Sequence, residues 1–246
     1  MTDLKGRRAL VTGGSRGIGA GIALALADKG ADVAITYQHS AERAAALVDT
    51  IEAKGVRAAA IQADSADAEA VRRSVEEAVA ALGGLDILVN NAGIATYGAL
   101  ESTDVAAIDA LLNVNVRAAV VAAGAVIPHL SAGGRIISIG SCLAERVPFA
   151  GSTAYSMTKS ALLAFTRGLS RDLGSRDITV NLVQPGPIDT DMNPADGEHA
   201  DVIRALTALG RYGTVEDIGA AVAFLASPAA RFITGSVLTV DGGAIA

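Results

Sequence analysis

Short apolar runs alternate with longer amphipathic stretches along almost the whole chain, and this alternation limits the folds that the chain can adopt. The apolar runs are nearly continuous, which is typical of strands covered on both faces. They span Ala9–Thr12, Asp32–Tyr37, Ala58–Gln62, Ile87–Asn90, Arg135–Ile139, Thr179–Val183 and Ser236–Val240. Helical periodicity marks Ile18–Lys29, Ala41–Lys54, Ala66–Ala81, Val105–Leu130, Ala154–Leu173 and Val215–Leu225. We therefore predict an α/β fold with a doubly wound, seven-stranded parallel sheet and helices on both faces.

The length and the absence of a linker indicate one domain. A chain of 246 residues suits one large α/β domain and can bury a substantial core. The loosest region, 186–200, contains proline, glycine and several acidic residues. We expect residues 1–246 to form a single domain, with a substrate loop around 189–205 that covers the site.

Charge and cysteine content narrow the partners and the compartment. The net charge is −6 and no basic run occurs, which argues against nucleic acid as the main partner. The single cysteine, Cys142, cannot form an intrachain disulfide, and it lacks a neighbouring base, so we expect a packing role. The polar start of the chain lacks a signal-peptide core, and the longest apolar run, Ala118–Ile127, is about half of a bilayer span. We expect a cytoplasmic protein without a membrane or metal partner.

A glycine-rich loop follows the first predicted strand and leads into a helix. Gly13, Gly17 and Gly19 have the spacing G-x-x-x-G-x-G, which differs from the common G-x-G-x-x-G fingerprint. Glycines allow backbone N–H groups to approach a phosphate, and a helix N-terminus favours negative charge. The alternative is a plain tight turn, in which glycine is needed only for steric reasons. Because of the strand before it and the helix after it, we predict a dinucleotide site.

Tyr155 and Lys159 are four residues apart and therefore project from one face of a helix. An ammonium group stabilises a nearby phenolate, so we expect Lys159 to lower the pKa of Tyr155 towards the operating pH of an acid–base catalyst. By spacing alone, the pair could equally be an ordinary surface contact. Ser141 follows the fifth predicted strand, where ligands of open α/β sheets bind. Ser138 is a competitor, although strand alternation points it elsewhere.

Several motifs together resemble the short-chain dehydrogenase/reductase family. They occur in the family's order and span nearly the whole chain: Thr12–Gly19, Asn90–Gly93, the Y-x-x-x-K motif Tyr155–Lys159, Pro185–Thr190 and the terminal Asp241–Gly243. The resemblance implies a Rossmann fold and reversible hydride transfer between a nicotinamide cofactor and a carbonyl group.

The same resemblance implies four catalytic residues. Tyr155 is the general acid/base, and Ser141, favoured by the family spacing, holds the carbonyl oxygen. Lys159 also binds the nicotinamide ribose. Asn115 orders a water molecule in a proton relay, with Asn113 as the alternative if the register differs.

The cofactor residues implied by the resemblance extend beyond the glycine loop. They are Gly13, Ser15, Arg16, Gly17, Ile18, Gly19, Tyr37, Gln38, Asp64, Ser65, Asn91, Ala92, Gly93, Tyr155, Lys159, Pro185, Gly186, Ile188 and Thr190. Tyr37 occupies the place where NAD-selective sites carry a carboxylate, and Arg16 could pair with the 2′-phosphate of NADP. We therefore favour NADPH over NADH. Asp64 is expected near the adenine, although Asp64 or Ser65 would serve equally as a helix N-cap.

Three functions remain open. The first is an NADPH-dependent reductase of ketones. The second is a 3-oxoacyl-carrier-protein reductase, but its acidic carrier needs a basic docking patch. Arg171 and Arg176 could contribute to such a patch, which would be thin. The third is binding of cyclic-di-GMP, because the segments 138–141 and 183–197 are also similar to a cyclic-di-GMP-binding branch of the family. The resemblance further implies a homotetramer, or a dimer, built through the long fourth and fifth helices, where 116–127 is rich in Ala and Val, and the C-terminal strand.

Overall fold

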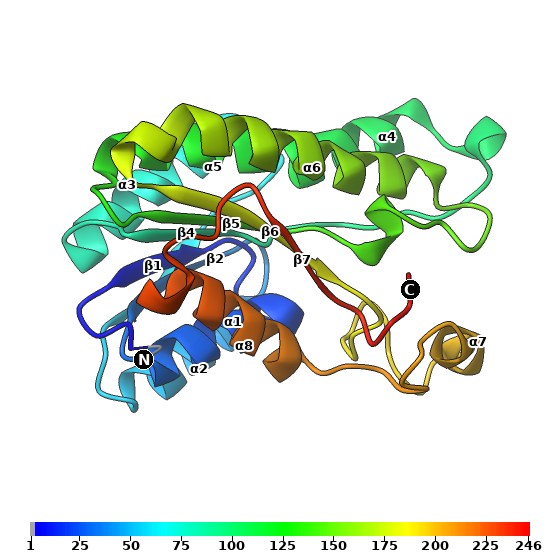
Figure 1. Cartoon of the computed structure of the whole chain (residues 1–246), viewed down its shortest axis with the longest axis horizontal. Helices are drawn as coiled ribbons and strands as arrows, with labels where there is room; N and C mark the ends of the chain where they lie inside the picture. Colours follow the sequence, from blue (N-terminus) through cyan, green and yellow to red (C-terminus); the bar gives the residue numbers. More distant parts are fainter. Residues whose placement is uncertain (1–2) are drawn as a thin grey trace.

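The computed structural model describes residues 3–246, so the first two residues of the predicted domain, Met1 and Thr2, lie outside the described part. Seven parallel strands form one sheet in the order β3-β2-β1-β4-β5-β6-β7 (Figure 1). The predicted single α/β domain with a doubly wound sheet is confirmed. The direction of winding reverses between β1 and β4, and such a reversal opens a crevice at the carboxyl ends of the strands.

The strands lie where the apolar runs predict them. Their bounds are β1 Arg8–Val11, β2 Asp32–Tyr37, β3 Ala58–Gln62, β4 Ile87–Asn90, β5 Arg135–Ile139, β6 Thr179–Pro185 and β7 Val237–Val240. In the register, Val11 pairs with Ile35 of β2 on one side and with Val89 of β4 on the other. The central strands β4, β5 and β6 are buried throughout, whereas every residue of β7 is only half-buried because β7 is an edge strand.

Helices cover both faces of the sheet. Those on one face are α1 Gly17–Asp28, α2 Ala41–Glu52 and α8 Val215–Ala226; those on the other are α3 Ala68–Leu82, α4 Val105–Leu112, α5 Ala118–Val126 and α6 Thr153–Leu173 (Figure 1). Each face has its own apolar core: Ile22 and Val222 pack in the first, and Val75 and Val126 in the second. The sheet therefore holds the loops at its carboxyl edge from both sides.

Two segments differ from the sequence prediction. The helix expected over Val105–Leu130 is interrupted by a π-helical turn, η2 Asn113–Arg117, and ends in a 3₁₀ turn, η3 Ile127–His129. A short helix, α7 Ala200–Ala205, occurs inside the predicted substrate loop, where six residues carry too little apolar periodicity to indicate it.

The stretch Val105–His129 is long and apolar enough, by length and composition alone, to cross a membrane. Of its most apolar window, 39% is buried. The buried residues of α5 belong to the core between this helical layer and the sheet, and a core helix of a globular domain passes the same test. The stretch is therefore weak evidence for a membrane span.

Helices α1 and α8 touch through glycine, which fixes the position of the α1 N-terminus. A Cβ added at Gly21 would lie 2.7 Å from Cβ of Val215, and one added at Gly219 would lie 2.7 Å from the carbonyl oxygen of Gly21. Side chains at these positions would force the helices apart, because closely packed interiors do not accommodate extra atoms freely.

We predict that Gly219→Ala lowers the free energy of unfolding by about 1–3 kcal/mol, because the added methyl group overpacks the α1–α8 contact. Gly168→Ala on α6 is the matched control: no heavy atom lies within 4 Å of the added carbon, so helix propensity should make it neutral or stabilising by about 0.5–1 kcal/mol. Thermal unfolding at one protein concentration measures both. Equal losses in the two variants would contradict the packing explanation.

Candidate active site

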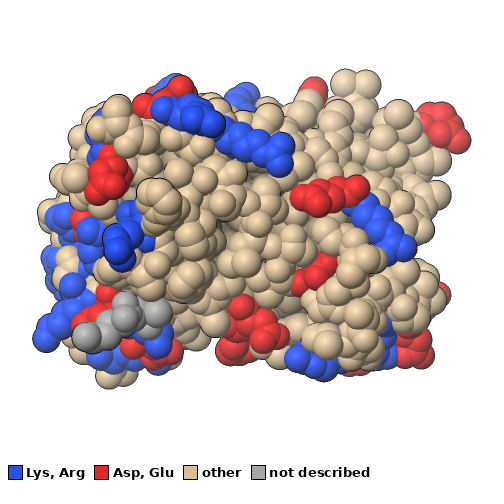
Figure 2. Space-filling model, viewed as in Figure 1, with Lys and Arg blue, Asp and Glu red and all other residues tan. Residues whose placement is uncertain are grey.

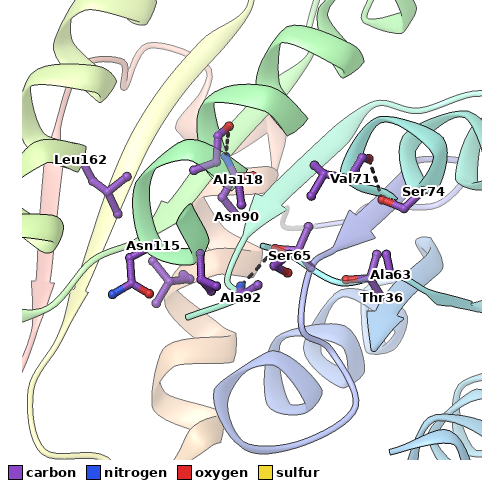
Figure 3. Close-up of a pocket in the computed structure, with 14 residues that line it drawn as sticks. Thr36, Ala63, Ser65, Val71, Ser74, Asn90, Ala92, Asn115, Ala118 and Leu162 are labelled. Carbon is purple, nitrogen blue, oxygen red and sulfur yellow. Dashed lines mark hydrogen bonds between the residues drawn. The ribbon is translucent and has the colours of Figure 1, made fainter. Parts of the chain in front are cut away.

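A pocket follows the carboxyl ends of the central strands and crosses the reversal between β1 and β4 (Figure 3). Residues at the ends of four strands line it: Thr12, Thr36, Asn90 and Ile139. Thr36 and Ala63 lie at one end and Asn115 and Leu162 at the other (Figure 3), so the pocket joins distant parts of the sequence. Its position is where dinucleotides bind in doubly wound sheets.

The glycine loop at this edge has the geometry of a phosphate cradle. Gly17 has a φ of 54°, in the left-handed region that favours glycine, and it begins α1. A Cβ added at Gly19 would lie 2.4 Å from the carbonyl oxygen of Gly13, so only glycine fits there. No acidic residue lies in the first turn of α1, and Arg16 at the N-cap makes no side-chain cap bond. The N-terminus of α1, with Ser15 before it and Ile18 in its first turn, therefore suits an anionic phosphate group.

Hydrogen bonds from the loop after β4 hold this cradle in place. The Nδ2 of Asn91 donates to the carbonyl oxygens of Thr12, at 2.9 Å, and Gly13, at 3.1 Å. The hydroxyl of Thr12 accepts from the backbone N–H groups of Asn91 and Ala92, each at 3.0 Å. The Asn91 side chain is thus occupied in fixing the glycine loop.

The ends of β2 and β3 form the far side of the pocket. Tyr37 ends β2, and Gln38 accepts a hydrogen bond through its carbonyl oxygen from Gln62 at 3.0 Å. The expected place of an NAD-selective carboxylate is therefore held by an uncharged residue, which fits NADP.

Neither of the expected cap residues begins the third helix. Asp64 accepts from the N–H of Ala66 at 2.8 Å, and Ser65 lines the pocket. The N-cap of α3 is Asp67, which accepts from Glu69, so the alternative cap role of Asp64 and Ser65 is wrong. The chain turns once more before the helix starts, which leaves Ser65 at the site.

The two candidate serines of β5 point in different directions. Ser138 is fully buried and faces Asn90, whose Nδ2 lies 3.5 Å from the serine hydroxyl. Ser141 lies beyond the end of the strand and caps the 3₁₀ turn η4 Cys142–Ala144 by accepting from Leu143 at 3.2 Å. Burial raises the pKa of the Cys142 thiol to about 11, with the charge of Asp241 adding to the shift, so this cysteine is a neutral packing residue at pH 7.

Lys159 is 5% exposed and its Nζ donates to the carbonyl oxygen of Ile139 at 3.1 Å. Burial lowers the pKa of Lys159 to about 8. The same Nζ lies 5.9 Å from the ring centroid of Tyr155.

The expected lowering of the Tyr155 pKa is wrong for the protein without cofactor. Burial raises the pKa of the Tyr155 phenol well above its ordinary value, nearby Tyr97 adds to the shift, and the side chain of Ser141 opposes it. Lys159 does not offset the burial of the phenol, because its own charge is desolvated and its Nζ is directed to Ile139. Tyr155 is therefore a neutral phenol at pH 7, the form that donates a proton.

Asn115 is the buried member of the predicted asparagine pair and lies in the π-helical turn. Its Oδ1 accepts from the N–H of Ile94 at 2.9 Å, and its Nδ2 donates to the carbonyl oxygen of Ile94 and to Thr158 Oγ1. A Cβ added at Gly93 would lie 3.4 Å from both Asn115 Oδ1 and Lys159 Nζ. The structure thus brings Asn115, Gly93 and Lys159 together, whereas Asn113 is half-buried outside this network.

The segment after β6 closes the site over the glycine loop. Gly186 donates to the carbonyl oxygen of Val240 at 3.0 Å, next to Pro185, and Ile188 is buried in the core. The methyl carbon of Thr190 would lie 3.5 Å from a Cβ added at Gly17. Thr190 therefore lies beside the α1 N-terminus, whereas Gly186 lies against Asp241 at the end of β7.

Two residues of interest were not predicted from the sequence. The ring of Tyr97 lies 5.8 Å from that of Tyr155, and the N–H of Gly98 bonds to the carbonyl oxygen of Gly151 at 2.9 Å, which joins the two loops. Arg43 of α2 forms an ion pair with Asp191 beyond β6. Neither has a recognisable local motif, because each partner comes from a distant part of the chain. Among residues 3–246, no group of His, Cys, Asp and Glu is arranged to hold a metal ion.

Comparisons with known proteins agree with this geometry. A family model described as Enoyl-(Acyl carrier protein) reductase matches residues 13–244. The Escherichia coli (strain K12) "Cyclic-di-GMP-binding biofilm dispersal mediator protein" is 44% identical over 98% of this chain and 98% of that protein. A short-chain dehydrogenase from Burkholderia cenocepacia J2315, in complex with NADP, is 61% identical with a TM-score of 0.98, covering 99% of each chain. A blue fluorescent protein from a metagenomic library, in complex with NADPH, is 55% identical with a TM-score of 0.98, covering 99% of this chain and 100% of that one.

The fold and the glycine-loop site define a dinucleotide-dependent oxidoreductase. The chain belongs to the short-chain dehydrogenase/reductase family. The matched structures contain NADP or NADPH, which agrees with the preference for NADP drawn from Tyr37 and Arg16.

The buried charge of Lys159 generates a prediction about stability. Between pH 8 and about 10.4, the ordinary pKa of lysine, the unfolded chain binds a proton that the folded protein has lost, so stability should rise with pH across this window. Lys159→Met should remove that rise and make the cofactor-free protein more stable at pH 7, by about 1–3 kcal/mol. Urea unfolding of both proteins from pH 7 to 10.5 measures the difference, in which other titrating groups cancel. Parallel stability curves would contradict a lowered pKa for Lys159.

Proposed function

We propose that the protein reduces ketones to alcohols with NADPH, reversibly, and that Tyr155 is its general acid/base. The observation that carries this proposal is the neutral phenol of Tyr155 beside Ser141, with the buried Lys159 behind it. Lys159 packs against Gly93, whose loop is hydrogen-bonded to the glycine loop through Asn91. NADPH, when bound, supplies the hydride for the carbonyl carbon. Tyr155 donates its proton to the carbonyl oxygen, and Ser141 holds that oxygen by a hydrogen bond.

Lys159 and Asn115 support the tyrosine in this proposal. A pKa of about 8 allows Lys159 to gain and lose a proton near neutral pH, so it can stabilise the phenolate left on Tyr155 and help to reprotonate it. Asn115 fixes the loop at Ile94 and the helix at Thr158, and thereby positions Lys159 between them. We propose that it also orders the water molecule through which Lys159 exchanges its proton.

The proposed cofactor residues divide by the part of NADP that they meet. Gly13, Ser15, Gly17, Ile18 and Gly19 would hold the pyrophosphate at the α1 N-terminus. Arg16, Tyr37 and Gln38 would meet the adenosine ribose and its 2′-phosphate. The remaining proposed contacts reach the adenine or the nicotinamide half: Asp64, Ser65, Asn91, Ala92, Gly93, Pro185, Gly186, Ile188 and Thr190.

Apolar side chains on the loops around Tyr155 favour an uncharged, bulky ketone. Tyr97, Phe149 and Met192 are 58%, 40% and 60% exposed, and they lie on loops that flank the tyrosine or follow β6. Exposed apolar side chains near a site provide contact area for an apolar substrate. The loop 189–205, which carries Met192 and α7, is the proposed substrate loop.

A carrier-protein substrate has less support. Arg176 donates to the carbonyl oxygens of Ile127 and Leu130, so it caps a helical segment. Arg171 lies 16 residues beyond Tyr155 on α6, or about 24 Å along the helix. On the face that Figure 2 shows, Lys and Arg side chains lie among Asp and Glu without a continuous basic surface.

The first test is Tyr155→Phe, which should lower kcat for ketone reduction by about 10²–10⁴-fold and leave the Kd of NADPH nearly unchanged, since only the transferable proton is lost. NADPH oxidation should be followed with an aryl ketone, a keto acid, an acetoacetyl ester and an enoyl ester. We expect the aryl ketone to be preferred. Near wild-type kcat in the variant would disprove the proposed role of Tyr155, and exclusive turnover of the enoyl ester would replace ketone reduction by reduction of a C=C bond.

Cyclic-di-GMP binding is the second candidate, favoured by the 44% identity to the E. coli protein of that description. Calorimetry with cyclic-di-GMP should then show saturable binding. Addition of excess NADP would tell whether the two ligands share the site at the α1 N-terminus. A titration without heat change, in a protein that binds NADPH, would exclude this candidate while ketone reduction stands.

We also propose that the protein is a homotetramer, or a dimer, in the cytoplasm. Two surfaces of the protein expose apolar side chains to solvent. Val105 and Val120 are exposed along α4–α5, and Phe232, beside the edge strand β7, is fully exposed. A second copy of the chain would cover each face.

A further inference from the structure

A cluster of three charged residues links three distant segments beside the cofactor site. Arg43, in the first turn of α2, contacts Asp191, in the loop after β6, with 2.7 Å between Nη1 and Oδ2. Arg16, in the glycine loop, reaches the same Asp191 oxygen, with 3.7 Å between Nη1 and Oδ2. Two guanidinium groups therefore converge on one carboxylate oxygen.

This cluster contributes little to the stability of the folded protein, so stabilisation of the fold does not account for its presence. The side chains of Arg16, Arg43 and Asp191 are 58%, 60% and 58% exposed. Exposed ion pairs of this kind add little to the free energy of unfolding, because water screens their attraction. The cluster has two positive charges and one negative charge, which leaves an excess of positive charge that a dianionic group would neutralise better than a carboxylate.

The surroundings of the cluster also suit a phosphate. The hydroxyl of Ser40, at the N-cap of the twelve-residue helix α2, makes no cap hydrogen bond. Tyr37, three residues earlier, ends β2 without a carboxylate. In dinucleotide sites this point of the sheet receives the adenosine ribose, whose 2′-phosphate distinguishes NADP from NAD.

We propose that Arg43 is a second residue for the 2′-phosphate of NADP, beside Arg16, and that Asp191 is the counter-ion which this phosphate displaces. The proposal rests on the NADPH-dependent function above. It adds a coupling between binding of the 2′-phosphate and the freedom of the substrate loop. In the structure, Asp191 pairs with both arginines. With a phosphate in its place, Asp191 is released, because a carboxylate beside a phosphate is repelled.

Release of Asp191 would act on the proposed substrate loop. Asp191 follows Thr190, which lies against the glycine loop, and precedes Met192. The other hydrogen bonds of this segment lie within the loop or reach 212–213: Asp189 Oδ1 accepts from the N–H of Ala195 at 2.9 Å, and Asn193 Oδ1 accepts from the Tyr212 hydroxyl at 3.4 Å. The pair with Arg43 is thus the loop's link to α2. Filling the 2′-phosphate site would free the loop from α2 before the ketone binds.

Binding measurements test the phosphate site directly. Titrations of Arg43→Gln, Arg16→Gln and Asp191→Asn with NADPH, NADH, 2′,5′-ADP and 5′-AMP give Kd values without turnover. Arg43→Gln should weaken NADPH and 2′,5′-ADP by about tenfold and leave NADH and 5′-AMP unchanged. Asp191→Asn should tighten only the two ligands that carry a 2′-phosphate, by several-fold, and this gain should disappear in the double variant with Arg43→Gln.

Arg57→Gln is the matched control. Arg57 is 58% exposed and pairs with Asp32 at 2.7 Å, but it lies at the amino ends of β2 and β3, away from the site. It should leave all four Kd values unchanged. A loss of NADPH affinity in Arg16→Gln alone would overturn the role of Arg43 while leaving the NADPH-dependent reductase intact. Equal losses for NADPH and NADH would also overturn it.

Hydrogen exchange tests the coupling to the loop. The amides of 191–199 should exchange faster with saturating 2′,5′-ADP than with saturating 5′-AMP, and Asp191→Asn should exchange fast with either ligand. Inorganic phosphate serves as a probe of the anion alone and should give a smaller change in the same direction. Identical exchange with 2′,5′-ADP and 5′-AMP in the wild-type protein would overturn the coupling.

Discussion

Thr12 joins two loops at the point where the sheet reverses its strand order, and the rest of the site depends on that junction. Its hydroxyl accepts two backbone N–H groups from the loop after β4, and the amide of Asn91 returns hydrogen bonds to the glycine loop. The loop that begins with these residues continues to Gly93, which packs against Asn115 and Lys159. The candidate phosphate cradle and the proposed acid–base group are therefore held by one chain of contacts across β1 and β4. A parallel sheet makes this possible because all its strands end at the same edge.

The proposed acid–base chemistry depends on a buried charge that destabilises the folded protein. Lys159 is buried with one hydrogen bond to a carbonyl oxygen, and its lowered pKa measures the penalty of removing the ammonium from water. A lysine in an exposed position would keep its proton too firmly to exchange it near neutral pH. The same burial keeps the Tyr155 phenol neutral, ready to donate. The environment that destabilises the charged lysine therefore also favours the protonation states that the proposed ketone reduction requires.

Much of the fold was predictable from the sequence, because strands covered on both faces are nearly continuous apolar runs such as Ile87–Asn90. The distinction between Ser138 and Ser141 was also predictable, since alternation along β5 turns Ser138 to the opposite side. The π-helical turn at Asn113–Arg117 was not, because it depends on the bonds of Asn115 to Ile94 and Thr158, which are tertiary. The pKa of Tyr155 was predicted in the wrong direction, because spacing reveals a neighbouring lysine but not the burial of both groups. Arg43 and Asp191 are 148 residues apart, so no local pattern could pair them.

In the proposed exchange of counter-ions, the position of Asp191 makes the substrate loop depend on which cofactor is bound. Thr190, one residue earlier, packs on the glycine loop, so the two loops are already in contact wherever Asp191 points. A single carboxylate would then compete with a phosphate for the two arginines. A ligand shifts such an equilibrium only by its differential affinity for the two states, and only a 2′-phosphate supplies a difference here. NAD would fill the pyrophosphate cradle equally well and leave the carboxylate in place. Selectivity for NADP and freedom of the substrate loop would therefore follow from one exchange of counter-ions.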